Sequence, residues 1–176
     1  MLPPSHVTYT LAVFDALKEK FPALRGLDMR WLAIAAMGPD LIDKPLALAY
    51  FYRAHGSAVL FAHTGFTHLA VLLFTLIKRP KIWPYLLAFN GHAILDRLWF
   101  FPDTWYWPFR GWQFHEWKQE EKKDLSVAYW EAFTRRPELV RWELIGLLAG
   151  LWLVWRHRLY QPQRLLHFIV TGEYPQ

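Results

Sequence analysis

Histidine and aspartate are the residues of this sequence whose types and spacing best suit chemistry, and four separate segments carry them. His92 and Asp96 are four residues apart, which places both side chains on one face of a helix, close enough to hold one ion. The residues between them are apolar, so we expect this face to point into the protein, where an unpaired carboxylate would be costly. A metal ion would satisfy the pair. The alternative is a hydrogen bond between Asp96 and His92, or an ion pair with Arg97.

A second segment places two histidines inside an uncharged stretch. His63 and His68 are five residues apart, and at the usual helical period their side chains diverge by about 140°. They would converge if Gly65 loosens the helix or if the motif lies at a helix start. Otherwise one is a ligand and the other contacts the substrate or the ligand shell. Two ordinary core histidines are the alternative.

Two further segments add carboxylates and one more imidazole. Asp40 and Asp43 lie at a turn that begins with Gly38 and Pro39, and turns can aim oxygen ligands at an ion; an Asx-type turn with Asp43 as a helix cap is the alternative. His6 lies at the start of the first expected helix, from which it would reach the bundle centre or point into solvent.

Together these segments predict a metal site with nitrogen and oxygen ligands, because the chain has no cysteine. Zinc, bound as one ion or as two ions about 3.5–4 Å apart, is the metal that such ligands favour. Which of the two aspartates is the ligand stays open. The candidate ligands are His6, Asp40, His63, His92 and Asp96.

The elements that must position these residues are helices, and residues 1–176 are expected to form one all-α domain, a helical bundle with the metal site between helices. Proline, glycine and capping residues mark the boundaries, and no segment alternates as a strand would. Ser5 is expected to cap the first helix, Asp28 the second, and Pro84 to lie in the first turn of a later one. The expected helices cover residues 5–21, 28–38, a short piece after Pro45, the run 56–77, then 84–101, 117–134 and 137–155, with a loop at 102–112.

Composition favours a membrane partner. Hydrophobic residues make up 54% of the chain and include 11 Trp, and the 22 residues of 56–77 carry no Asp, Glu, Lys or Arg, enough to span a bilayer. The runs 82–95 and 144–155 are too short, and Trp and Arg crowd 152–164 as at a headgroup boundary. Residues 1–14 do not resemble a signal peptide. We expect membrane association, as at the cytoplasmic side of a bacterial-type inner membrane; a soluble cytoplasmic core of buried helices is the alternative.

The motifs, taken in order, resemble those of the YdjM-like membrane-bound metal-dependent hydrolases. The resemblance is carried by residues 38–43 (GPDLID), 63–68 (HTGFTH), 91–96 (GHAILD) and Pro108-Phe109, and His6 fits an early family histidine. Thr64 stands where the family has an arginine that would suit a substrate phosphate. The order is also similar to that of zinc-dependent phospholipase C and the single-strand-specific zinc nucleases, which would imply one site at Asp40, His63, His92 and Asp96, with His6 near a second.

The leading hypothesis is therefore a metal-dependent hydrolase of phosphoesters, with phospholipids among the candidate substrates. Asp43 or Asp103 would orient the attacking water or act as general base, and His68 would protonate the leaving group or stabilise charge. The aromatic stretch 99–117 suits lipid docking or plain packing. A nuclease is a second hypothesis, since the net charge of +5 attracts phosphates, although the basic residues form no stripe. The third is a non-enzymatic membrane or partner-binding protein with a structural metal.

Overall fold

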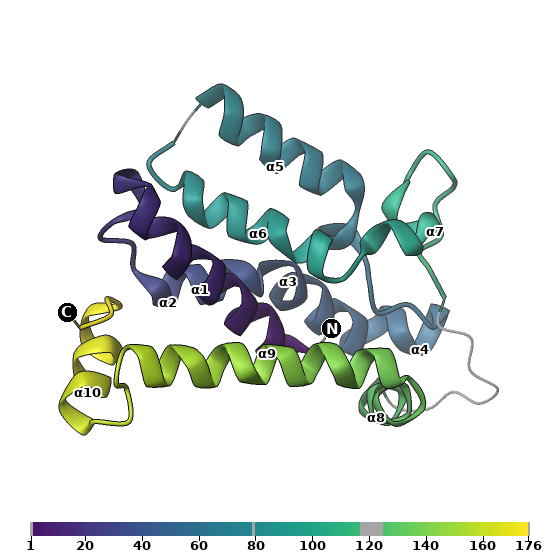
Figure 1. Cartoon of the computed structure of the whole chain (residues 1–176). Coiled ribbons are helices and arrows are strands. Elements are labelled where there is room, and N and C mark those ends of the chain that lie inside the picture. Colours follow the sequence, from purple (N-terminus) through teal and green to yellow (C-terminus); the bar gives the residue numbers. More distant parts are fainter. Residues whose placement is uncertain (1, 79, 117–124, 176) are drawn as a thin grey trace.

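The computed structural model describes residues 2–78, 80–116 and 125–175, and every regular element within these ranges is a helix (Figure 1). This confirms the predicted all-α class. In chain order the elements are α1 (Pro3–Lys20), η1 (Pro22–Leu24), α2 (Met29–Ala36), α3 (Gly38–Leu46), η2 (Ala47–Phe51), α4 (Tyr52–His55), η3 (Phe61–His63), α5 (Gly65–Lys78), α6 (Trp83–Leu95), η4 (Leu98–Phe100), α7 (Pro102–Trp105), α8 (Leu125–Arg135), α9 (Pro137–Arg156) and α10 (Pro162–Thr171).

Helix α1 is central, because α2 and α9 both pack along it and α2 packs in turn on α6 (Figure 1). The core at this junction takes side chains from all four helices and from η1: Leu11, Phe14, Leu24, Met29, Leu32, Ala88 and Leu153. The burial of such side chains is the main stabilising contribution in a helical protein of this size.

The helix starts are partly those predicted. Asp28 caps α2, and its carboxylate accepts from the backbone N–H of Arg30 at 2.9 Å. Pro84 lies in the first turn of α6, where its missing N–H costs little. The prediction that Ser5 caps α1 is wrong: α1 begins at Pro3, so Ser5 lies inside it, and its hydroxyl donates to Glu143.

Helix α3 begins directly after α2, so the expected start after Pro45 is also wrong. Gly38 allows this close succession, because a Cβ there would lie 2.5 Å from the ring of Phe89 on α6. Pro45 falls inside α3, and the wide turn of η2 follows it. A proline has no N–H to donate, so a change of helical pitch after it is expected. The packing of Gly38 on α6 brings Asp40 towards His92.

The uncharged run 56–77 is not one helix. It contains an irregular segment, the short turn η3 and then α5, which begins at Gly65, where a Cβ would lie 2.7 Å from the carbonyl oxygen of Trp105. None of the helices that the structure describes combines the length and hydropathy needed to cross a bilayer.

The second half of the chain differs from expectation mainly at the boundaries. Helix α6 ends at Leu95, not near residue 101, because Arg97 adopts a left-handed conformation with φ of 52°. The predicted loop 102–112 contains the short helix α7, and α10 was not predicted. Of the predicted helix 117–134, residues 117–124 lie outside the described ranges, and α8 covers the rest. The long helix that Pro137 starts is confirmed as α9.

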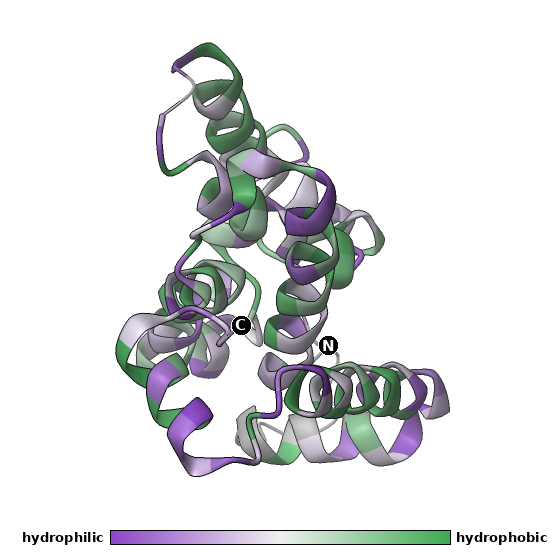
Figure 2. Cartoon of the chain, turned by 60° about the vertical axis from the view of Figure 1, so that its left-hand side comes forward, coloured by the Kyte–Doolittle hydropathy of each residue, from purple (hydrophilic) through white to green (hydrophobic). Residues whose placement is uncertain are grey.

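Helices α5 and α9 lie on opposite sides of the molecule (Figure 1), and the ribbon coloured by hydropathy shows many hydrophobic residues along both (Figure 2). On α9, Leu144, Leu148 and Trp155 are all more than half exposed. On α5, Leu69 and Ile77 are likewise more than half exposed. Exposed apolar surface of this extent usually marks a site that binds a partner protein or a membrane.

Candidate metal centre

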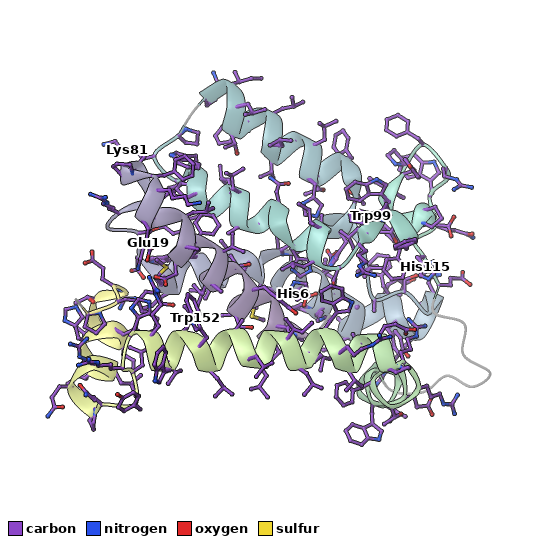
Figure 3. The ribbon with its side chains drawn as sticks, viewed as in Figure 1. His6, Glu19, Lys81, Trp99, His115 and Trp152 are labelled. Carbon is purple, nitrogen blue, oxygen red and sulfur yellow. The ribbon has the colours of Figure 1, made fainter. Side chains whose placement is uncertain are left out.

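All five predicted metal ligands meet at one buried place between α1, α3, α6 and η3. His6 marks this place in the interior of the molecule (Figure 3). His6, Asp40 and His92 offer ligand atoms that lie within 4.8 Å of one another, and His63, His92 and Asp96 do the same. His92 belongs to both groups, so the two groups form one continuous cluster. The three histidines are fully buried, and the side chains of Asp40 and Asp96 are 5% and 13% exposed.

His92 lies at the middle of the cluster, and its tautomer follows from its partner. Its Nδ1 lies 2.8 Å from the carbonyl oxygen of Ala36, which can only accept, so Nδ1 carries the proton. Nε2 makes no hydrogen bond and lies 3.3 Å from Asp96 and 3.8 Å from Asp40. A buried imidazole whose Nδ1–H is anchored and whose Nε2 makes no hydrogen bond has the arrangement typical of a metal ligand.

His63 has the same arrangement, with Asp43 behind it. The Nδ1 of His63 lies 2.6 Å from Asp43 Oδ2, and its Nε2, which makes no hydrogen bond, lies 3.4 Å from Asp40 Oδ1. Burial by itself would lower the pKa of His63, but the carboxylates of Asp40 and Asp43 outweigh it and raise that pKa to about 9. The two carboxylates that make His63 bind its proton strongly would attract a metal cation in the same way.

The structure does not favour the predicted role of Asp43 as a general base or water-orienting group. Its carboxylate is fully buried and accepts from the backbone N–H groups of Leu60, Ala62 and His63 as well as from the His63 ring. With both oxygens committed, it is not the free carboxylate that a general base or a water-orienting group needs. Of the two aspartates, Asp40 faces the cluster and Asp43 positions His63.

Asp40 is shared between the cluster and a cation that the sequence reasoning missed. Lys44, one helical turn later, lies 2.7 Å from Asp40 Oδ2, while Oδ1 faces His63 and His92. Burial opposes ionisation, but His63 and Lys44 hold the pKa of Asp40 well below its usual range. The spacing of four between Asp40 and Lys44 on a helix was the signal that could have identified this pair.

His6 completes the cluster from α1. Its ring stacks on that of His92, with centroids 3.9 Å apart and planes 11° from parallel, and its Nε2 lies 3.0 Å from Asp96 Oδ1. Burial lowers the pKa of His6, and Asp96 offsets this only in part. For Asp96, burial would raise the pKa, but contacts with His6 and His92 hold it well below the usual value. Three imidazole rings and two ionised carboxylates together offer the nitrogen and oxygen ligands that suit zinc or a similar divalent ion.

His68 lies beside the cluster but outside both ligand groups. Asn90 fixes its tautomer: the Asn90 amide donates to the carbonyl oxygen of Leu86 at 3.2 Å, so the Asn90 oxygen accepts from His68 Nδ1 at 3.0 Å. The buried Nε2 then has a lone pair and no hydrogen-bond partner. Burial lowers the pKa of His68 to about 4. A neutral Nε2 accepts a hydrogen bond and does not donate one, so this geometry favours an accepting role for His68 over the predicted acid role.

Asp103, the other carboxylate considered as a base, is not part of the cluster. Its side chain is 54% exposed on α7 and lies 3.9 Å from Nδ1 of His115. Asn90 and Lys44 are the functional neighbours that sequence reasoning missed. Asn90 is adjacent to the GHAILD motif, but only its contact with α5, 22 residues earlier in the chain, gives it a role.

Comparisons of this chain with protein-family models, with curated proteins and with solved structures found no match. The functional argument therefore depends on the residues of the chain itself, and above all on the cluster of His6, Asp40, His63, His92 and Asp96.

Proposed function

We propose that this protein is a metal-dependent hydrolase that cleaves phosphoesters, with zinc as the ion. The observation that carries the proposal is that His63 and His92 each anchor Nδ1–H outside the cluster and turn an Nε2 that makes no hydrogen bond towards the carboxylates of Asp40 and Asp96. Buried nitrogen atoms without partners cost free energy unless something binds them. The resemblance of the motif order to metal-dependent hydrolases supports the same proposal.

A divalent ion bound there would supply Lewis acidity towards a phosphoryl oxygen and lower the pKa of a coordinated water. The chain's own residues supply the rest. Asp43 and the Ala36 carbonyl group accept from Nδ1–H of His63 and His92 and so orient both rings with Nε2 towards the cluster. His68, held by Asn90, presents a neutral Nε2 that accepts a hydrogen bond from a water and so orients it.

The test is metal content together with activity. Elemental analysis of protein purified without chelator is expected to find at least one equivalent of zinc, manganese or iron, and hydrolysis of bis(p-nitrophenyl) phosphate is expected to require it. Replacing His92 and Asp96 together by alanine should remove both metal and activity. His167→Ala, an exposed histidine on α10, is the matched control and should change neither.

The outcomes separate the alternatives. Folded protein that neither contains nor takes up metal contradicts the whole proposal. Stoichiometric metal without turnover of phosphodiesters, phospholipids or single-stranded DNA indicates a structural site. Turnover of single-stranded DNA alone favours a nuclease.

We also propose that the enzyme works at a membrane surface. The outer face of α9 supports this, because exposed leucines there are followed by Trp155, Arg156 and Arg158, a combination that suits the boundary between acyl chains and anionic headgroups. Co-flotation with vesicles containing phosphatidylglycerol is expected, and Leu144→Glu together with Leu148→Glu should abolish it. Protein that stays with the soluble fraction at low salt would contradict this part of the proposal.

A further inference from the structure

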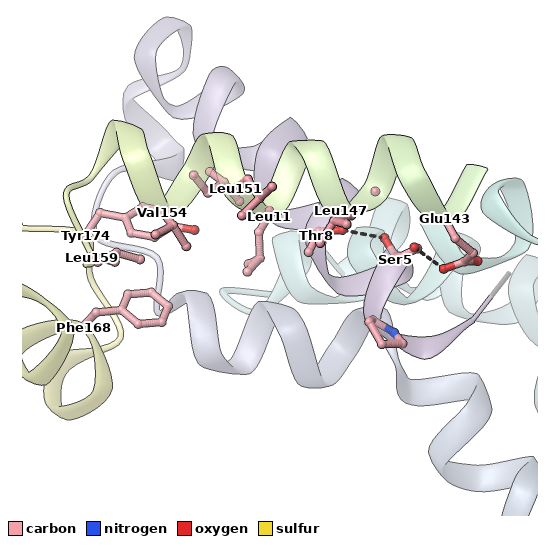
Figure 4. A pocket seen from close by; sticks show the side chains of 14 residues that line it. Ser5, Thr8, Leu11, Glu143, Leu147, Leu151, Val154, Leu159, Phe168 and Tyr174 are labelled. Carbon is pink, nitrogen blue, oxygen red and sulfur yellow. Dashed lines mark hydrogen bonds between the residues drawn. The ribbon is translucent and has the colours of Figure 1, made fainter. Parts of the chain in front are cut away.

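An apolar groove with a cavity volume of ≈ 470 Å³ follows the seam between α1 and α9 (Figure 4). Thr8 and Leu11 of α1 form one wall, Leu147 and Leu151 of α9 form the other, and Phe168 of α10 lies at one end. None of the proposed metal ligands lines it. The groove is therefore separate from the metal centre, although both use α1.

Two glycines of α9 create the groove. A Cβ on Gly146 would lie 2.5 Å from Ser5 Oγ, and one on Gly150 would lie 2.9 Å from Thr8 Cγ2. Helix α9 thus touches α1 closely at two points one helical turn apart. Leu147 and Leu151 directly follow these glycines, so they stand along one side of the contact line and leave a channel between themselves and α1.

Apart from Thr8, whose hydroxyl donates to the carbonyl oxygen of Ser5, the polar side chains of the groove lie at its two ends. At one end the Ser5 hydroxyl donates to the carboxylate of Glu143 (Figure 4). At the other end lies Tyr174, whose ring stacks on His157 with centroids 3.8 Å apart and on Phe168 with centroids 5.1 Å apart. Tyrosine commonly occupies such a boundary, because its ring is apolar and its hydroxyl is polar.

Tyr174 also lines a second pocket, of ≈ 570 Å³, whose charged groups are Lys18, Glu19, Arg25 and Glu173, with His157 beside them. The apolar groove and this charged pocket therefore adjoin at one side chain.

The charges of this second pocket are of both signs. Lys18 pairs with Asp15 and Glu19 pairs with Arg156. In the part of the chain that the structure describes, Arg25 and Glu173 pair with no opposite charge. A pocket that offers one unpaired cation and one unpaired carboxylate complements a ligand group that carries both an anion and a cation.

The dimensions of the groove fit an extended chain. Its wall runs from Glu143 to Val154, which at the helical rise is about 16 Å. A volume of ≈ 470 Å³ over that length corresponds to a cross section of roughly 30 Å². This elongated shape suits a single unbranched hydrocarbon chain.

We propose that the α1–α9 seam binds a single-chain amphiphile with a zwitterionic phosphate head, such as a lysophospholipid. The hydrocarbon chain lies in the groove between Leu11 and Leu151, and the ring of Tyr174 marks the junction of chain and head. The head lies in the charged pocket, where Arg25 faces the phosphate and Glu173 faces the ammonium group. This site requires neither the metal nor the hydrolase activity.

The test is equilibrium binding of lysophosphatidylcholine to the full chain, measured by calorimetry below the critical micelle concentration of each probe. Affinity is expected to rise about fourfold per added methylene among short chains and to level off once the chain exceeds the groove. Fatty acids of equal chain length, which lack the cationic group, are expected to bind more weakly.

Matched variants test the location. Leu151→Trp fills the groove and should weaken binding at least tenfold, whereas Leu148→Trp, on the neighbouring exposed position that does not line the groove, should leave affinity unchanged. Arg25→Ala should weaken the lysophospholipid, while Lys20→Ala, at the exposed end of α1, should not. Circular dichroism confirms that each variant is folded.

Three results would overturn the proposal: no saturable binding, no dependence on chain length, or an equal effect of Leu148→Trp and Leu151→Trp, which would mean non-specific adhesion to the face of α9. The double variant His92→Ala and Asp96→Ala should bind the amphiphile as the wild type does. Failure of the metal centre and failure of this site are therefore seen in different experiments.

Discussion

Replacing Asp43 by asparagine tests the idea that this residue positions His63 rather than reacting. The change keeps the shape of the side chain and removes its charge. If the amide oxygen takes the place of Oδ2, it can still accept from Leu60, from the His63 backbone and from the His63 ring, but the new NH₂ group then faces the N–H of Ala62, 3.0 Å from the former Oδ1. Two donors therefore oppose each other in a fully buried place.

The expected cost follows from these contacts. A buried unsatisfied N–H costs about 1–3 kcal/mol, and hydrogen bonds to a charged acceptor are worth roughly 1 kcal/mol more than neutral ones. We expect the free energy of unfolding of the metal-free protein to fall by about 2–5 kcal/mol, which for a chain of this length lowers Tm by roughly 5–15 °C. Loss of the charge behind a ligating histidine should also weaken zinc binding about 10–100-fold.

The assay is urea denaturation of metal-free protein, followed by competition for zinc with a chromophoric chelator. Asp103→Asn is the matched control, because the same substitution at a half-exposed carboxylate should change stability by less than about 0.5 kcal/mol. If Asp43→Asn has the stability and the zinc affinity of the control, the reasoning about Asp43 and His63 is refuted.

Three further outcomes are expected. Because folding raises the pKa of His63 from 6.5 to about 9, the proton on His63 stabilises the metal-free fold fully below pH 6.5. The free energy of unfolding should therefore fall as pH rises from about 6.5 to 9. His63→Gln should lose this slope, and a slope of opposite sign would contradict the geometry. Gly146→Ala should destabilise the fold by about 1–3 kcal/mol in thermal denaturation, because the added methyl group would meet α1. Gly91→Ala, in open space on α6, should instead stabilise the fold by about 0.5–1 kcal/mol. Equal effects would mean that α9 does not pack closely on α1. Asn90→Leu should leave metal content unchanged and lower phosphodiesterase turnover about 10–100-fold through His68, and loss of metal instead would make His68 a ligand.

The charge of the centre is a consequence of its burial. Asp40 and Asp96 stay ionised in a place where burial alone would favour their neutral forms, because imidazoles and Lys44 surround them. Without a metal, His63 carries a proton on both ring nitrogens at neutral pH, because its pKa is about 9. Binding of a divalent ion must displace that proton, so we expect zinc uptake to release protons and its apparent affinity to rise with pH.

The helical class and most helix boundaries followed from local sequence. Proline in a first turn and an aspartate cap act over a few residues, and Pro84, Pro137 and Asp28 begin their helices as predicted. The uncharged run 56–77 is not one helix, because α5 begins only at Gly65. The close contact of Gly65 with Trp105, 40 residues later, has no local signature.

The sequence by itself pointed to the residue types of the candidate metal centre, since four segments place His or Asp beside apolar runs and the chain has no cysteine. Only the tertiary structure decided their roles. Asp40 faces the cluster and Asp43 does not, because Asp43 caps the backbone of residues 60–63. The orientation of the His92 ring depends on a carbonyl group 56 residues away, which accepts from its Nδ1–H. Helix periodicity is local and can be predicted from sequence, whereas a tautomer is fixed by whichever acceptor the packing of distant helices brings within hydrogen-bond distance.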